Sequence, residues 1–293
     1  MNRDHDHHHH HAPPDFNRAF FVGVVLNVAF VVVEVVFGLL SNSLALLTDA
    51  GHNLSDVLGL VLAWGAAVLA QTTPSLRRTY GYSRATILAS LASGLLLLAA
   101  VGAIAWEAVG RLFAPVQPAG LTIMIVAAVG VVINTATALM FVRGKDHDLN
   151  VRGAFLHMAA DAAVSLGVVI SGALILWQGW AWVDPVISLV IAGVILWSTW
   201  GLLRDSLNLA VDAVPSGIDP EAVRAFLDAK PGVVGLHDLH IWAMSTTDSA
   251  LTVHLVMAPL PDSDRFLNEI AAELKARFGI QHATIQLERG EDG

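Results

Sequence analysis

Six long apolar stretches, separated by short polar breaks, dominate what this chain can fold into. Each has about 20 residues or more, the length that a helix needs to cross roughly 30 Å of hydrocarbon. Only 14% of the 293 residues are charged, whereas soluble domains average about 25%. We therefore expect six membrane-spanning helices, at Phe16–Leu40, Leu44–Ala70, Ala85–Leu112, Ala119–Val142, Ala154–Trp177 and Val183–Leu203.

Basic residues are distributed unevenly between the two ends of these stretches. They occur before the first stretch, in the breaks after the second and the fourth, and after the sixth, while the opposite end has Arg111 alone. By the positive-inside rule, both termini are cytoplasmic. The pattern is typical of a multi-pass protein of a cell membrane or bacterial inner membrane, with the lipid bilayer as its surroundings.

Two matched pairs of ionisable residues interrupt the apolar stretches. His52 and Asp56 lie in the second stretch, and His157 and Asp161 lie in the fifth. A spacing of four places each pair on one helix face, one turn apart. Ionisable groups within a bilayer are costly and usually mark function. Because the chain has no cysteine, a metal must be bound through nitrogen and oxygen, and two imidazoles with two carboxylates form a tetrahedral set that Zn²⁺ accepts.

A shell of four protein ligands favours transport over catalysis, because a catalytic zinc keeps one coordination position open. Histidine exchanges metal for protons near neutral pH, which predicts that the site exchanges a divalent metal ion for protons, that is, Zn²⁺/H⁺ antiport. Polar groups that only join helices are the structural alternative. A membrane-embedded zinc hydrolase and a non-transporting metal sensor are the functional ones, although the chain has no His-Glu-x-x-His or Gly-x-Ser-x-Gly motif.

Further polar residues surround the first pair. Asp49 lies one turn before His52, and we predict that it orients a metal ligand, with a proton relay or an alternate ligand as other roles. Asn53 follows Asp49 by four residues and could bond to it. Glu34, in the first stretch, is expected to pair with a polar group of another helix.

The composition changes after residue 207, where the long apolar stretches end and charged residues become frequent. We divide the chain into a His-rich disordered tail (1–15), a six-helix transmembrane domain (16–207) and a cytosolic domain (208–293) that carries most of the net charge of −9. The cytosolic domain is predicted to be α+β with the order αββαβ and helices on one face of the sheet, at Asp219–Lys230, Val233–Met244, Leu251–Ala258, Ser263–Phe278 and Ala283–Leu287. Its acidity argues against a nucleic-acid partner.

These motifs together resemble the cation diffusion facilitator family. The resemblance rests on five segments: Leu47-Thr48-Asp49-Ala50-Gly51-His52-Asn53-Leu54-Ser55-Asp56, His157-Met158-Ala159-Ala160-Asp161, His237-Asp238-Leu239-His240-Ile241-Trp242, Val253-His254-Leu255 and Ile280 to Glu288. It implies a homodimer that exports Zn²⁺, and sometimes other divalent transition metals, in exchange for protons. It also implies a ferredoxin-like, metallochaperone-like cytosolic domain and a transport site of His52, Asp56, His157 and Asp161.

The cytosolic histidines form a second candidate site. By resemblance, His237, His254 and Glu288 fall where the family binds a regulatory cytosolic metal, with His282 and Asp264 as further candidates. Ordinary buried or hydrogen-bonded histidine is the alternative. His237 and His240 are three apart, which on a regular strand places them on opposite faces.

The N-terminal tail is rich in histidine. We predict that it collects metal on the cytoplasmic side, through His5, His7, His8, His9, His10 and His11.

Overall fold

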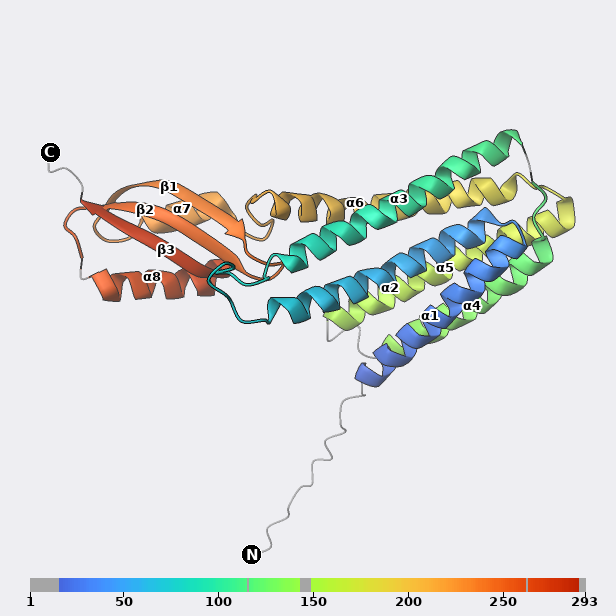
Figure 1. The fold of residues 1–293 in the computed structure, drawn as a ribbon, viewed down its shortest axis with the longest axis horizontal. Helices are drawn as coiled ribbons and strands as arrows, with labels where there is room; N and C mark the ends of the chain where they lie inside the picture. The colour runs from blue at the N-terminus through green and yellow to red at the C-terminus, as the bar shows by residue number, and fades with distance from the viewer. Residues whose placement is uncertain (1–15, 115, 143–148, 262, 290–293) are drawn as a thin grey trace, which may run out of the picture. The chain divides into compact units, whose positions relative to one another are not determined.

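The computed structural model describes residues 16–114, 116–142, 149–261 and 263–289 (Figure 1). It confirms the predicted fold class, an all-helical membrane region followed by a small αββαβ domain. The first six elements are α1 Phe16–Leu40, α2 Leu44–Ala70, α3 Ala85–Phe113, α4 Gly120–Phe141, α5 Leu149–Gln178 and α6 Val183–Ala210.

Two of these helices extend well beyond their predicted bounds. α5 begins at Leu149 rather than Ala154, and α6 continues to Ala210 rather than ending at Leu203. The extension of α6 contains Arg204 and Asp205. The length of an apolar stretch matches the thickness of hydrocarbon that a helix crosses. A helix that continues beyond the hydrocarbon is therefore longer than its apolar stretch, and its end cannot be predicted from apolar length.

Among the described residues, five helices are long and apolar enough to cross a membrane: α2, α3, α4, the Phe155–Gln178 part of α5, and α6. In α1 the corresponding apolar segment within the described side chains is shorter, Val25–Leu40. Large apolar side chains such as Trp64, Trp106 and Trp197 are exposed on these helices. Such surfaces are stable against lipid rather than water.

The chain divides into two compact units, and three helices contribute to both. The first unit contains the described residues up to Leu54 together with Ala103–Ala192, and the second contains Ser55–Gly102 and Gly193–Gly293. Within the first unit α4 and α5 pack backbone against backbone. A Cβ on Gly172 would lie 2.7 Å from the backbone nitrogen of Met124 and 2.8 Å from the carbonyl oxygen of Gly120. Small residues allow such close approach between membrane helices.

The first turn of α2 is held by the start of α6. The buried Asp184 carboxylate accepts hydrogen bonds from Ser43 Oγ (2.5 Å), the Leu44 N–H (2.7 Å) and the Ala45 N–H (3.4 Å). A helix leaves its first N–H groups without internal partners, and here a carboxylate 140 residues away accepts from two of them. This cap fixes the start of α2 two turns before His52.

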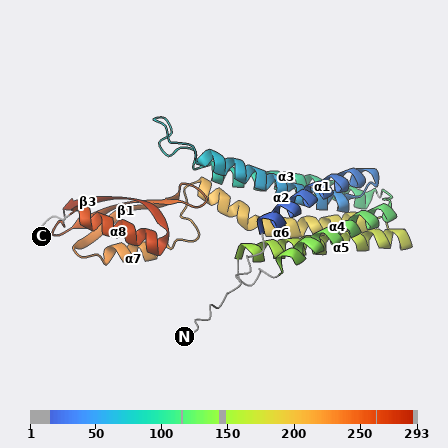
Figure 2. The same ribbon diagram turned by 90° about the horizontal axis from the view of Figure 1, so that it is seen from below.

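The remaining elements form the αββαβ domain: α7 Pro220–Asp228, β1 Val233–Ala243, β2 Ser249–Met257, α8 Ser263–Phe278 and β3 Ile280–Arg289. β2 is the central strand, antiparallel to β1 and parallel to β3. Figure 2 shows α7 and α8 on one face of this sheet. The core between them includes Leu227, Leu251, Leu255 and Leu274, which are almost fully buried.

A bulge in β1 overturns the expected facing of two histidines. Opposite β2, His237 pairs with His254 and His240 pairs with Thr252, so two residues of β1 stand against one of β2. Asp238, inside the bulge, has a φ of 50°. Because cross-strand partners share a face and alternate residues of β2 do too, His237 and His240 lie on the same face, not on opposite ones.

Candidate metal centres

Three of the four predicted intramembrane ligands come together. Nε2 of His52, on α2, lies 3.4 Å from Oδ1 of Asp161, on α5, and Nε2 of His157 lies 3.6 Å from Oδ2 of the same carboxylate. The two imidazole rings are 6.0 Å apart between centroids and meet edge to face, 77° between planes. Asp161 is 1% exposed, so this charge is withdrawn from solvent where two imidazoles reach it.

These distances suit a tetrahedral metal. Zinc bonds nitrogen and oxygen at about 2.0–2.2 Å, which separates neighbouring ligand atoms by about 3.3 Å. The separations of 3.4 and 3.6 Å are close to this value. One candidate ligand atom from each of His52, His157 and Asp161 lies within 4.8 Å of the others. Three nitrogen and oxygen donors therefore converge on a volume of ionic size, with no sulfur among them.

Asp56 lies outside this group. It follows His52 by one turn on α2, is partly buried, and belongs to the stretch of α2 that is part of the second compact unit. The group of ligand atoms within 4.8 Å comprises His52, His157 and Asp161. The fourth ligand therefore stays a prediction from the sequence.

Two carboxylates, Glu34 and Asp49, are fully buried in the same unit. Asn53 Nδ2 donates to Glu34 Oε2 (3.2 Å), so Glu34 does pair with a polar group of another helix. Asn53 therefore bonds to Glu34 rather than to Asp49. Asp49 instead accepts a hydrogen bond from Ser165 Oγ of α5 (2.9 Å).

These carboxylates retain acceptor capacity. Among the described residues, the remaining oxygens of Glu34 and Asp49 have no donor partner, and the two carboxyl groups can hydrogen-bond to each other when one of them carries a proton. A buried acceptor left unsatisfied is costly. The pair of Glu34 and Asp49 therefore suits the uptake of a proton or a water molecule. Ser165 was not singled out in the sequence, and its position four residues after Asp161 on α5 was the available signal.

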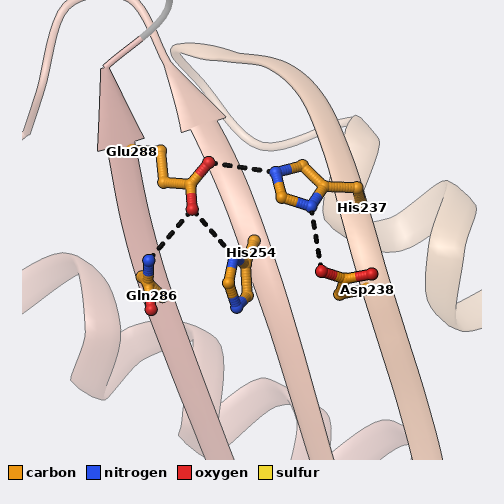
Figure 3. A network of polar contacts seen from close by, with 5 residues as sticks. All are labelled: His237, Asp238, His254, Gln286 and Glu288. Atoms are coloured by element: carbon orange, nitrogen blue, oxygen red, sulfur yellow. Dashed lines mark hydrogen bonds and ion pairs between the residues drawn. The ribbon is translucent and has the colours of Figure 1, made fainter.

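The second cluster lies on the face of the αββαβ sheet that the helices leave open (Figure 3). Glu288, on β3, contacts both histidines: its Oε2 is 2.9 Å from His237 Nε2 and its Oε1 is 2.8 Å from His254 Nδ1. The two rings are 4.9 Å apart. Gln286 Nε2 donates to Glu288 Oε1 (2.9 Å). Candidate ligand atoms of His237, His254 and Glu288 all lie within 4.8 Å of one another.

Hydrogen bonding in this cluster shifts two pKa values in opposite directions. Hydrogen bonds to Glu288 and then Asp238 raise the pKa of His237. Hydrogen bonds from His237 and His254 lower the pKa of Glu288. Without metal the arrangement therefore favours protonated imidazole beside ionised carboxylate, and a metal has to replace the imidazole proton. Asp238 and Gln286 were not predicted from the sequence.

The other candidate ligands lie apart from this cluster. His282 pairs with Ala250 in the parallel register, six residues before Glu288 on β3, which on a strand is about 20 Å. Asp264 is exposed in the first turn of α8. The tail histidines, His5 to His11, lie outside the described residues.

Two family profiles match successive parts of the chain. The profile described as "Cation efflux transmembrane domain" matches residues 20–209, and the profile described as "Cation efflux protein, cytoplasmic domain" matches residues 215–290. The chain belongs to the cation efflux family, the cation diffusion facilitators. It is thus a member of a transporter family and not an enzyme, which sets aside the zinc-hydrolase alternative. It is a multi-pass membrane protein with a cytoplasmic C-terminal domain.

Several cation efflux proteins are similar over nearly the whole chain. The metal cation efflux system protein CzcD of Cupriavidus metallidurans is 38% identical over 97% of this chain and 89% of its own. The zinc transporter ZitB of Escherichia coli is 35% identical over 98% and 93%. The cadmium, cobalt and zinc/H(+)-K(+) antiporter of Bacillus subtilis is 33% identical over 92% and 88%.

One solved structure is also similar to part of the chain. It is the metal-bound C-terminal domain of the CzcD transporter from Cuprividus metallidurans, 39% identical over 24% of this chain and 98% of its own, with a TM-score of 0.22.

Proposed function

We propose that this protein exports divalent transition-metal ions from the cytoplasm, Zn²⁺ above all, in exchange for protons. The observation that carries the proposal is the buried Asp161 carboxylate with His52 and His157 within 3.6 Å of it, in a chain of membrane-spanning helices. Two similar proteins are named for transport of this kind, the zinc transporter ZitB and the cadmium, cobalt and zinc/H(+)-K(+) antiporter.

Asp56 is the proposed fourth ligand. It stands one turn from His52 on α2, as Asp161 stands one turn from His157 on α5. A metal held by two imidazoles and two carboxylates has a closed shell, so the ion is bound during passage rather than used for chemistry. Release then requires the histidines to take up protons, which they do near neutral pH. Alternating access of this site to the two sides of the membrane would couple the two flows.

Glu34 and Asp49 are the proposed companions of this exchange. Both carboxyl groups are fully buried and lie within hydrogen-bond reach of each other, so the pair is placed to share one proton. They offer proton-accepting positions in the unit that holds His52 and Asp161. The position of Asp49, three residues before His52, suits a role in orienting the ligands or relaying protons.

The cytoplasmic domain is proposed to be a metal-responsive dimerisation domain. His237, His254 and Glu288 converge on one face, and a bound dication would reduce the repulsion between two acidic domain copies. The ion there is a regulator, distinct from the transported ion. The tail histidines are proposed to collect metal near the membrane, with both termini cytoplasmic and the protein in the inner or cell membrane.

The test is metal flux in sealed vesicles that contain the full-length protein. We expect Zn²⁺ flux driven by a pH gradient, and its abolition by D161N. D205N is the matched control, because Asp205 is exposed on α6 and has the same charge and the same replacement. Flux that ignores the pH gradient would refute antiport. Zinc binding without flux in the unaltered protein would favour the non-transporting sensor.

A further inference from the structure

The break between α2 and α3 forms a pocket that neither metal centre uses. The pocket has a volume of about 280 Å³ and is lined by three arginines of the break, Arg77, Arg78 and Arg84, by Tyr80, and by Trp242 and Met244 of the cytoplasmic domain. All of these residues belong to the second compact unit. Because Trp242 and Met244 are part of the cytoplasmic domain, the pocket lies on the cytoplasmic side.

The arginines differ in how their charge is balanced. Arg84 is paired with the carboxylate of Asp212 (2.5 Å), whereas Arg77 and Arg78 have no acidic partner among the described residues. The guanidinium of Arg78 stacks over Tyr82, 4.7 Å from the ring centroid. Stacking leaves the planar edge of a guanidinium available for two parallel hydrogen bonds to a phosphate. The pocket therefore keeps a net positive charge and two unused donor groups.

Hydrogen bonds hold the loop between α2 and α3 in a defined conformation. Ser75 and Arg78 exchange two backbone hydrogen bonds of 3.0 Å, which closes a tight turn with Leu76 and Arg77 at its tip. On the domain side, the Thr246 N–H donates to Thr86 Oγ1 (3.1 Å). The positive-inside rule accounts for arginines on this side, but it requires neither a closed turn nor a pocket shared with the cytoplasmic domain.

One apolar side chain at this tip favours a lipid, rather than a soluble molecule, as the source of an anion. Leu76 is fully exposed, beside Arg77 and two residues after Pro74. An apolar side chain next to arginines suits the boundary between headgroups and acyl chains. There the apolar side chain is buried among acyl chains and the arginines contact phosphates. The loop also connects two helices that are long and apolar enough to cross the membrane, so its two ends lie at the membrane surface.

We propose that this pocket binds the phosphate headgroup of an anionic phospholipid from the cytoplasmic leaflet. Arg77 and Arg78 bind the phosphate oxygens, and Leu76 enters the boundary of the acyl chains. Trp242 and Met244 also line the pocket, so the cytoplasmic domain contacts the same headgroup. A soluble phosphate would use the same arginines but would gain nothing from Leu76.

The test is lipid titration of the full-length protein in neutral detergent, read by native mass spectrometry. Two arginines near an anionic headgroup give phosphatidylglycerol a preference of about 30-fold over phosphatidylcholine. R77Q/R78Q should remove most of this preference. R224Q/R265Q removes two exposed arginines of the cytoplasmic domain and should leave it intact. L76S should weaken phosphatidylglycerol binding without affecting the exchange of inorganic phosphate.

Three results would overturn the proposal. Equal binding of the two lipids would mean that the arginines serve topology alone. An equal loss in both double variants would mean that overall charge, not this pocket, attracts the lipid. Displacement of phosphatidylglycerol by inorganic phosphate, with L76S behaving as the unaltered protein, would assign the pocket to a soluble anion. R77K/R78K keeps the charge and reports on bidentate geometry if the glutamine variant folds poorly.

Discussion

The close contact between α4 and α5 leads to a sharp prediction for Gly172→Ala. The new Cβ would lie 2.7 Å from the backbone nitrogen of Met124 and 2.8 Å from the carbonyl oxygen of Gly120. Ordinary contacts of this kind begin near 3.4 Å. Both neighbours are backbone atoms, which cannot rotate away, so the helices have to separate by several tenths of an ångström.

The magnitude follows from two opposing effects. Overpacking costs about 1–3 kcal/mol, while alanine is preferred over glycine inside a helix by about 1 kcal/mol. We therefore expect G172A to lower the free energy of unfolding by up to about 2 kcal/mol, which lowers the midpoint of thermal unfolding by up to about 8 °C for a domain of this size. Because α5 carries His157 and Asp161, zinc flux should fall as well.

Gly167 provides the matched control for this experiment. It lies on the same helix, and a Cβ there would meet nothing within 4 Å, so G167A gains helix preference without a clash. Thermal unfolding in detergent should rank G167A at or above the unaltered protein and G172A below it. If the two variants melted together, the α4–α5 contact would not be as close as described.

Two further predictions concern Asp184 and the cytoplasmic cluster. D184A removes the acceptor for three donors at the start of α2, which costs about 1–3 kcal/mol for each buried donor left unpaired. Thermal unfolding should show a large decrease in the unfolding midpoint for D184A. The decrease should be smaller for D184N, which keeps one acceptor oxygen. In the cluster, the pKa of His237 is raised, so protons compete with zinc to a higher pH than for ordinary histidine, and zinc affinity should fall about tenfold per pH unit below that pKa. D238N removes one cause of the raised pKa of His237 without removing a ligand. Zinc affinity, measured by chelator competition in a D161N background, should therefore begin to fall at a lower pH in this variant. An unchanged dependence of zinc affinity on pH would contradict this reading.

The sequence predicted most of the helices because each depends on one local property. Apolar length alone located α1 and α2 to the residue, and Asp219 with Pro220 marked the start of α7, where the Asp219 carboxylate accepts from the Glu221 N–H. The order αββαβ also followed from local patterns. These signals are read within one turn or one strand and do not depend on distant residues.

Contacts between elements were harder to predict. Asn53 is close in sequence to Asp49, yet it bonds to Glu34 of α1, because the rotation of α2 about its axis is set by packing against other helices. The bulge at Asp238 had only a weak advance signal, since aspartate adopts a positive φ several times more often than most residues but still uncommonly. The cap from Asp184 joins residues 140 apart in the chain, which periodicity cannot detect.

The bulge in β1 has one more consequence. Residues before it and residues after it are out of step by one position, so His237 and His240 share a face while Leu236 and Ile241 both point to the core. Loss of Asp238 would leave His237 and His240 two apart, where simple alternation keeps both on the open face. Straightening the strand with every residue kept would instead exchange inside for outside on one side of the bulge. Either Leu236 would enter water and His237 the core, or Ile241 and Trp242 would exchange faces, so the bulge absorbs the additional residue and keeps the imidazoles and the apolar side chains on their own faces.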